Sequence, residues 1–152
     1  MGQTDPIKLV DNLKRGNLRT NVGIWRLPLS KIGQEADIAF RLDLGALDAR
    51  KEFLSKLPAK TEYARLSVTR LYEFLDEIAN RSDMRDCVLI YNFDLLLAGL
   101  RKELDRNQVW QDLYNRFPNR QHALLITIPE TASHLLPSDD MLEKWQKDGR
   151  LS

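Results

Sequence analysis

The stretch from Cys87 to Asp94, Cys-Val-Leu-Ile-Tyr-Asn-Phe-Asp, constrains the fold of this 152-residue chain more than any other. Residues 87–90 form an apolar run of strand length, which is typical of a strand buried on both faces of a parallel sheet. Two polar residues, Asn92 and Asp94, follow where such a strand would leave the sheet. Ligand sites of open α/β sheets lie outside the carboxyl ends of the strands. We therefore expect Asn92 and Asp94 to face any site that this protein has.

Three further stretches are expected to join this strand in one sheet. Residues 21–27 and 122–128 are short apolar runs that end at Pro28 and Pro129, respectively. Residues 36–43 alternate between apolar and polar side chains and predict a strand with one polar face. Apolar spacing and capping signals predict helices near residues 6–15, 47–57, 66–80, 95–104, 108–117 and 139–148. This order predicts an α/β fold with a mainly parallel sheet of about four to five strands and helices on both faces.

The length of the chain fits one domain with one core. We expect residues 1–19 to form an N-terminal helix and lead-in, and residues 20–152 to form the core. An apolar content of 43% with 30% charged residues excludes disorder by composition. The formal net charge is only +1, so the chain as a whole has no electrostatic bias toward nucleic acid or membranes.

Cysteine content and hydropathy bear on the cellular compartment. Cys87 is the only cysteine, so it has no intrachain disulfide partner, and a small core residue is favoured over a nucleophile. The first residues lack the basic and apolar regions of a secretory signal. No run approaches the ~18 apolar residues that a bilayer-spanning helix requires. We expect a cytoplasmic location and no membrane association.

Metal and nucleophile chemistry has little support in the sequence. Cys87, His122 and His134 lack the paired spacing of a zinc site, and no Gly-x-Ser-x-Gly motif is present. Asp43 and Asp94 would both follow strands, so they are a candidate pair for a magnesium-dependent nuclease. Strand-end carboxylates are common by chance, and we therefore predict no catalytic residue and no metal ligand.

A basic surface is expected between the last two strands, with Trp110 and Tyr114 interleaved. Cations and aromatic rings together can hold phosphates and stack bases. Acidic residues at positions 103, 105 and 112 lie among them, which is typical of a solvated, salt-bridged helix face. The candidate nucleic-acid-binding residues are Arg101, Lys102, Arg106, Arg116 and Arg120.

The order of these segments resembles the core of a P-loop NTPase of the AAA-like kind. In that family, a hydrophobic strand ends in an acidic pair that holds magnesium, and the next strand ends in a polar sensor residue. Residues 88–97 look like the first of these strands, with Tyr91 at the position of the magnesium-binding aspartate and Asp94 as a remaining acid. Residues 123–128 look like the sensor strand, with Thr127 as the sensor. Within this class, the chain is most similar to the small P-loop-fold proteins of bacteriophage-exclusion (BREX) defence operons.

The chain departs from this family where phosphate would bind. A phosphate-binding loop needs several glycines and a lysine followed by serine or threonine. After the first strand, the sequence offers only Ser30, Lys31 and Gly33, and Ile32 follows the lysine. The resemblance therefore implies a degenerate member that keeps the fold and has lost hydrolysis. If nucleotide still binds, with ATP and magnesium as ligands, the expected residues are Arg26, Lys31, Asn92, Asp94 and Thr127.

The leading hypothesis is a non-catalytic accessory or regulatory subunit without a cofactor. It would act through a protein partner or as a homo-oligomer, in a prokaryotic anti-phage or DNA-handling complex. Trp25, Trp110 and Trp145 are candidate anchors for a partner, although a place in the core is favoured for each. The alternatives are an ATPase with an unorthodox phosphate loop and a nucleic-acid-binding module.

Overall fold

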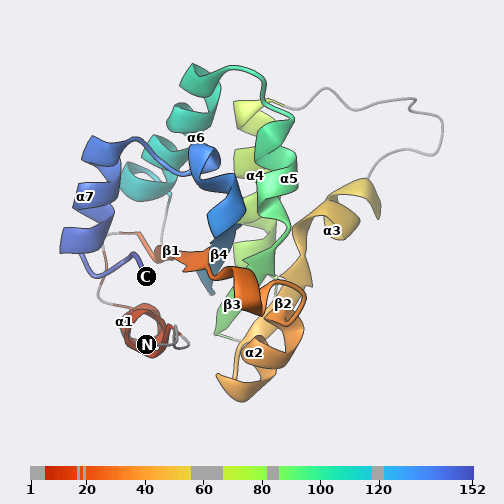
Figure 1. Cartoon of the computed structure of the whole chain (residues 1–152), viewed down its shortest axis with the longest axis vertical. Coiled ribbons are helices and arrows are strands. Elements are labelled where there is room, and N and C mark those ends of the chain that lie inside the picture. The colour runs from red at the N-terminus through yellow and green to blue at the C-terminus, as the bar shows by residue number, and fades with distance from the viewer. Residues whose placement is uncertain (1–5, 17, 19, 56–66, 82–85, 118–121) are drawn as a thin grey trace.

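A computed structural model describes residues 6–16, 18, 20–55, 67–81, 86–117 and 122–152. Its centre is a four-stranded, all-parallel sheet with the strand order β1-β4-β3-β2 (Figure 1). The strands are β1 (Val22–Leu27), β2 (Gly45–Asp48), β3 (Cys87–Tyr91) and β4 (Ala123–Pro129). The predicted α/β class, with a parallel sheet and helices on both faces, is confirmed. The architecture is consistent with a P-loop-like α/β core.

The two central strands are the two apolar runs that the sequence marks most clearly. In β3 and β4, residues 87–90 and 123–128 are all buried, and Cys87 to Ile90 pair in register with Ala123 to Ile126. A strand with neighbours on both sides and helices over both faces has no solvent-exposed side. The apolar runs at these positions follow from that burial.

The strand expected over residues 36–43 is wrong. These residues lie in and just after helix α2 (Glu35–Arg41), and the second strand is the short β2 segment that follows. A short apolar pattern fits both structures, and here the burial has the helical period. Ile38 and Ala39 are adjacent and both buried, whereas Phe40 is 85% exposed. The sequence analysis missed β2, because it has four residues and only Leu47 among them is buried.

The other helices follow the expected order with shifted ends. The helices expected near 6–15, 66–80 and 139–148 are confirmed. The helix expected over 47–57 includes the last residues of β2. The helices expected over 95–104 and 108–117 are instead α5, which ends at Ala98, and α6, which begins at Glu103. The helix α4 (Val68–Ala79) begins after Ser67, whose hydroxyl accepts a hydrogen bond from the Arg70 N–H at 3.1 Å. The remaining elements are α1 (Ile7–Arg15), η1 (Leu29–Lys31), α3 (Ala49–Ser55), α4 (Val68–Ala79), α5 (Phe93–Ala98), α6 (Glu103–Asn115), η2 (Glu130–Leu135) and α7 (Asp139–Lys147). No helix of the described residues is long and apolar enough to span a membrane.

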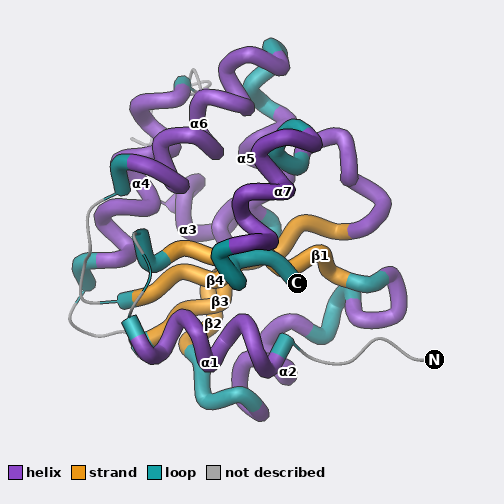
Figure 2. The backbone as a smooth tube through the Cα atoms, turned by 90° about the vertical axis from the view of Figure 1, so that its left-hand side faces the viewer, coloured by secondary structure: helices purple, strands orange, loops and turns teal. Residues whose placement is uncertain are grey.

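The sheet separates two unequal helical layers (Figure 2). We call the side covered by α3, α4, α5, α6 and α7 the thick face, and the side covered by α1 and α2 the thin face. Alternate strand residues point to opposite faces, so Val88 and Ile90 enter the thick-face core while Cys87 and Leu89 enter the thin-face core.

The thick-face core contains an aromatic cluster. Trp110 packs edge-on against Phe93 and Trp145, with ring centres 6.3 and 6.2 Å apart. The indole N–H of Trp110 donates to the Leu135 carbonyl at 2.9 Å. All three tryptophans, including Trp25 in the thin-face core, are fully buried. They are core residues, so their proposed role as exposed partner anchors is wrong.

The thin face depends on a close approach between α1 and the sheet. A side chain at Gly23 in β1 would meet Leu9 at 2.8 Å and Leu13 at 3.3 Å, so the absence of a side chain there lets α1 lie close to the strand. The helix ends at Gly16, which has a left-handed backbone with φ of 69°. Gly23 therefore lets α1 pack directly on β1, and Gly16 ends this helix.

The outer edge of β1 is covered by residues 150–152. The Ile24 N–H donates to the Arg150 carbonyl at 2.8 Å, and the Ser152 N–H donates to the Ile24 carbonyl at 2.9 Å. Arg150 itself is fully buried, and its Nε donates to the Val22 carbonyl at 2.9 Å. Its guanidinium lies 4.4 Å from the centre of the Trp145 ring. One edge of the sheet is therefore closed by a strand-like segment held by a buried cation.

Candidate functional site

The carboxyl ends of β1 and β4 are the place in this topology where a ligand site would form. The chain leaves β1 toward β2 on one side, and it leaves β4 toward the segment 150–152 on the other side of β1. Neighbouring strands whose connections run in opposite directions open a crevice at their carboxyl ends. Leu27 pairs with Pro129 at this point, and Pro28 follows directly. The candidate site is therefore the carboxyl edge of the sheet.

The loop after β1 offers few free N–H groups to an anion. Pro28 and Pro129 have no N–H, and three of the N–H groups after Pro28 are bonded within the loop. The Lys31 N–H donates to the Pro28 carbonyl at 2.9 Å, and the Gln34 N–H donates to the Lys31 carbonyl at 3.0 Å. A phosphate cradle needs several backbone N–H groups that point at one anion. Three of the six backbone N–H groups of this loop, those of Lys31, Ile32 and Gln34, instead bond within the loop.

Acidic groups gather on the same edge. Glu35 in the first turn of α2 is buried, and its negative charge acts on both Tyr91 and Asp94. Burial raises the pKa of the Tyr91 hydroxyl, and the charges of Asp48 and Glu35 raise it further. Burial also raises the pKa of Asp94 against hydrogen bonds from the backbone N–H groups of Asp94 and Leu95, and Glu35 adds to the rise. This edge therefore disfavours further negative charge, including that of a phosphate.

The structure separates the residues predicted to bind nucleotide. The Arg26 side chain turns to the outer edge of β1, where its Nε donates to the Ser152 carbonyl at 3.2 Å. Thr127 is buried, and its hydroxyl donates to the Ile90 carbonyl at 3.3 Å. Lys31 lies on η1, while Asn92 and Asp94 follow β3, where Asn92 has a left-handed backbone with φ of 63°. Asn92 and Asp94 lie at the carboxyl edge as expected from the sequence, and Lys31 follows the carboxyl end of β1 at the same edge.

The candidate nuclease pair of Asp43 and Asp94 is wrong. Asp43 follows α2 and precedes β2, so it lies at the amino end of a strand. Asp94 follows β3 and lies at the opposite edge of the sheet. The error came from the strand predicted over 36–43, which would have put Asp43 at a carboxyl end.

The cysteine and the histidines do not form a site. Cys87 is buried at the start of β3, and burial raises the pKa of its thiol to about 12, which makes it a core residue and a poor nucleophile. His122 lies at the amino end of β4, where its Nε2 contacts the Arg81 carbonyl, and His134 lies beyond the carboxyl end of the same strand. Among the described residues, no three His, Cys, Asp or Glu side chains are grouped to hold a metal.

The predicted basic surface is divided between the two ends of α6. Arg101 and Lys102 precede the helix, and Arg106 in its first turns donates to the Leu100 carbonyl at 2.7 Å. Arg116 follows the helix and lies 3.7 Å from the Asp112 carboxylate. A helix of 13 residues is about 20 Å long, so the cations do not form one patch. Arg120 lies outside the described residues.

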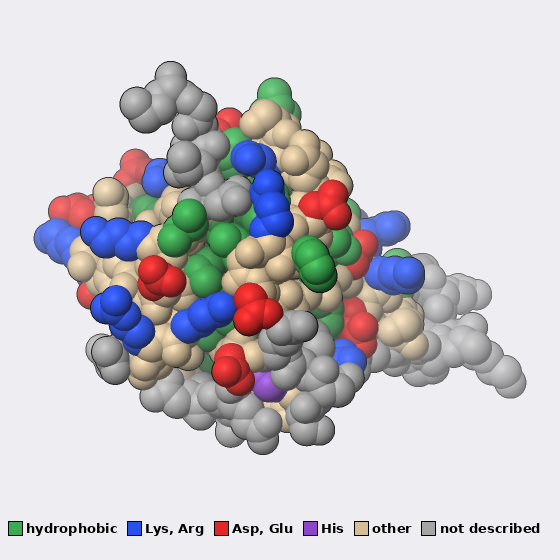
Figure 3. Space-filling view, turned by 90° about the horizontal axis from the view of Figure 1, so that it is seen from below, with side chains coloured by type: hydrophobic (Ala, Val, Ile, Leu, Met, Phe, Trp, Pro, Cys, Tyr) green, Lys and Arg blue, Asp and Glu red, His purple; other side chains and the backbone are tan. Residues whose placement is uncertain are grey.

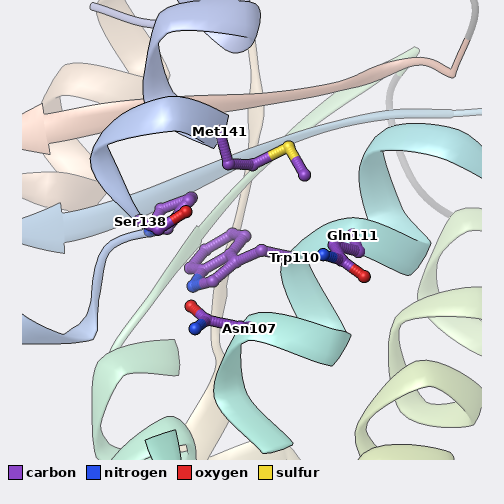
Figure 4. A pocket seen from close by; sticks show the side chains of 6 residues that line it. Asn107, Trp110, Gln111, Ser138 and Met141 are labelled. Carbon is purple, nitrogen blue, oxygen red and sulfur yellow. The ribbon is translucent and has the colours of Figure 1, made fainter. Parts of the chain in front are cut away.

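Three hollows in the described part of the chain lie away from the carboxyl ends of β1 and β4. One of about 50 Å³ lies between α6 and α7, where Trp110 faces Ser138 and Met141 (Figure 4). It is far below the roughly 300 to 1,000 Å³ of ligand pockets. A groove of about 420 Å³ follows β2 and α3, and a hollow of about 270 Å³ lies between Tyr72 of α4 and Arg116. The groove is lined by Ala46, Leu47, Asp48, Lys51, Glu52, Ser55, Arg81 and Tyr91.

The sequence analysis did not single out Glu35, the acidic residue on which the charge of the carboxyl edge depends. Its signal was present, because an acidic residue in the first turn of a helix is a common N-terminal feature. Because residues 36–43 were expected to form a strand, Glu35 was not recognised as the first turn of a helix. No family model, curated protein or solved structure matches the chain.

Proposed function

We propose that this chain is a non-catalytic accessory or regulatory subunit that acts through protein contacts. The observation that carries the proposal is the chemistry of the carboxyl edge. The loop after β1 bonds half of its N–H groups to itself, and Glu35 and Asp94 place negative charge beside it. Phosphoryl transfer depends on positive charge and donors aimed at the phosphates. This edge is negatively charged and aims few donors outward, which supports a role in protein binding over a role in phosphoryl transfer.

The setting of the subunit follows from the sequence resemblance. The segments 88–97 and 123–128 look like the acidic and sensor strands of AAA-like P-loop proteins, among them the small proteins of BREX operons. The parallel sheet is consistent with a core of that kind. We therefore propose a place in a prokaryotic anti-phage or DNA-handling complex, in the cytoplasm, with a protein partner or a second copy. Contact with nucleic acid would then come from the complex, since the cations around α6 are divided between its two ends.

Calorimetric titration with ATP and magnesium, alongside thermal unfolding with and without ATP, tests the proposal. A ligand at one hundred times its dissociation constant adds about 2.7 kcal/mol to the apparent stability of the folded state. We expect neither heat of binding nor a thermal shift at millimolar ATP. Saturable binding that weakens in both Lys31→Ala and Asp94→Ala would overturn the proposal in favour of a nucleotide-binding enzyme. Binding unchanged in these variants would place nucleotide elsewhere and would also contradict a purely protein-binding role.

A further inference from the structure

The strand β2 forms an edge of the sheet that stays open among the described residues. In the strand order β1-β4-β3-β2, β2 pairs with β3 on one side only. The opposite edge, at β1, is closed by residues 150–152. No backbone hydrogen bond between described residues reaches the outer side of β2. An unpaired edge strand presents N–H and C=O groups with which another extended chain can pair.

The groove of about 420 Å³ described above runs along this edge and is lined mainly by β2 and α3. Arg81, which precedes β3, and Tyr91, which ends β3, both line it. The groove therefore extends along the length of the strands. Its volume lies within the roughly 300 to 1,000 Å³ of ligand pockets. A groove beside an open edge strand suits an extended peptide, because the edge supplies main-chain hydrogen bonds and the groove receives side chains.

The two ends of the groove differ in charge. At one end, Arg81 lies 3.2 Å from the Glu52 carboxylate, and this ion pair leaves no net charge. At the other end, Asp48 is the register partner of Tyr91 in the β2–β3 pair. The charges that act on the Tyr91 hydroxyl there are those of Asp48 and Glu35, and both are negative. The Tyr91 end of the groove is therefore complementary to a cation.

Glu35 is a buried carboxylate without a partner at this end. It is only 7% exposed, and it forms no hydrogen bond or ion pair with another residue in the part of the chain that the structure describes. Its charge acts on both Tyr91 and Asp94, so it lies close to both. A buried charge without a counter-charge is costly. A basic side chain that entered from the groove would supply the missing counter-charge.

Selectivity for a cation comes from these few groups, since the surrounding face is mixed in sign. Figure 3, which views the molecule from below, shows Lys and Arg side chains interspersed with Asp and Glu. Lys51 also lines the groove and is exposed, but its printed contact with Asp48 is a hydrogen bond from its backbone N–H at 3.1 Å. That bond fixes the Asp48 carboxylate at the start of α3 and leaves its charge in place.

We propose that the open edge of β2 binds an extended peptide segment of a partner protein, with one Lys or Arg side chain of that segment against Tyr91 and Glu35. The main chain of the peptide pairs with β2, and its cation lies near the Tyr91 ring and balances the charge of Glu35. This inference rests on the proposed function, since it names the chemistry of the protein that the chain contacts.

Selection of random nine-residue peptides, displayed on phage, against the purified chain supplies the probe. We expect the selected peptides to share one Lys or Arg. Fluorescence anisotropy then gives the dissociation constant of the most frequent selected peptide. Replacement of its basic residue by glutamine should raise the dissociation constant at least about tenfold, because Glu35 would again lack a counter-charge.

Three variants of the chain locate the peptide. Glu35→Gln keeps the shape of the side chain and should raise the dissociation constant at least about tenfold. Asp37→Asn is the matched control, because it removes the same charge from an exposed position of the same helix and should change the constant by less than about twofold. Ala46→Tyr, at an exposed position that lines the groove, should block binding. Circular dichroism confirms that each variant remains folded.

Selected peptides without a shared basic residue, or equal affinity for the parent and for Glu35→Gln, would overturn the inference. Binding that is insensitive to Ala46→Tyr would also overturn it, because the peptide would lie away from β2. A selection that yields no binding peptide would overturn it as well. If such a chain also fails to bind ATP, the proposed function stays in place, whereas saturable ATP binding would overturn the proposed function.

Discussion

The thick and thin faces of the sheet show how one set of strands can serve two purposes. Among the described residues, the thick-face core cluster has 25 buried residues and the thin-face cluster has 12. The thick layer buries Phe93, Trp110 and Trp145 completely. The thin layer consists of two short helices of nine and seven residues and leaves Phe40 exposed. Hydrophobic stabilisation follows the buried apolar area, so most of it should come from the thick face. The thin face is the side with surface left over for another molecule.

The largest expected effect is the loss of an aromatic ring from the thick-face core. Trp110→Ala removes a fully buried indole that touches Phe93 and Trp145, together with its hydrogen bond to the Leu135 carbonyl. We expect the free energy of unfolding to fall by about 3 to 5 kcal/mol. Urea unfolding followed by circular dichroism measures the change. A loss below about 1 kcal/mol would show that this cluster does not dominate the stability of the thick face.

A second large effect is expected at the buried cation that holds the outer edge of β1. Arg150→Ala would leave the Val22 carbonyl without its side-chain donor and remove the ring contacts to Tyr114 and Trp145. We expect a loss of about 2 to 3 kcal/mol, and Arg150→Lys should recover part of it because the charge returns without the planar fork. Denaturant unfolding of both variants measures this order. An alanine variant as stable as the lysine variant would contradict it.

A core substitution on the thin face should cost less and act more locally. Leu13→Ala removes a buried side chain of α1 that lies close to β1 at Gly23. We expect a loss of about 2 kcal/mol, at the low end for buried leucine because the thin layer can relax. Hydrogen exchange should show amides of α1 exchanging faster in this variant, with amides of α4 and α6 less affected. Equal acceleration in all three helices would show that the two faces unfold as one unit.

The smallest effect is expected at Asp94, on the carboxyl edge shared by both layers. The pKa of this carboxyl is raised in the folded protein, mainly by burial, so ionisation costs stability as the pH rises from the unfolded value of about 3.9 through the folded value. Asp94→Asn should therefore stabilise the protein slightly at neutral pH, by about 0.5 kcal/mol or less because the group is only half-buried. Thermal unfolding should show this gain at pH 7 and none near pH 3. A variant that is less stable than the parent at pH 7 would show that the backbone hydrogen bonds to the carboxylate matter more than its burial.

The sequence by itself determined the elements whose apolar patterns are long or fully buried. The strands β3 and β4 were predicted nearly to the residue, because residues between two neighbouring strands and two helical layers have to be apolar throughout. The helix α4 was predicted close to its observed bounds, since its cap at Ser67 and its apolar stripe from Leu71 to Ile78 act within one segment. Asn92 and Asp94 were placed correctly at the carboxyl edge for the same reason, because they follow a strand that the sequence marks clearly.

Tertiary structure decided the features that depend on contacts between distant segments. Residues 36–43 fit a strand and a helix equally well in isolation, and burial of Ile38 and Ala39 in the thin-face core selected the helix α2. That choice moved Asp43 to the opposite edge from Asp94 and brought Glu35 close to Asp94 and Tyr91. The burial of Arg150 against β1 also joins residues far apart in the chain, so no local pattern predicts it. Local periodicity specifies what a segment can form, whereas burial against a partner specifies which form has the lower free energy.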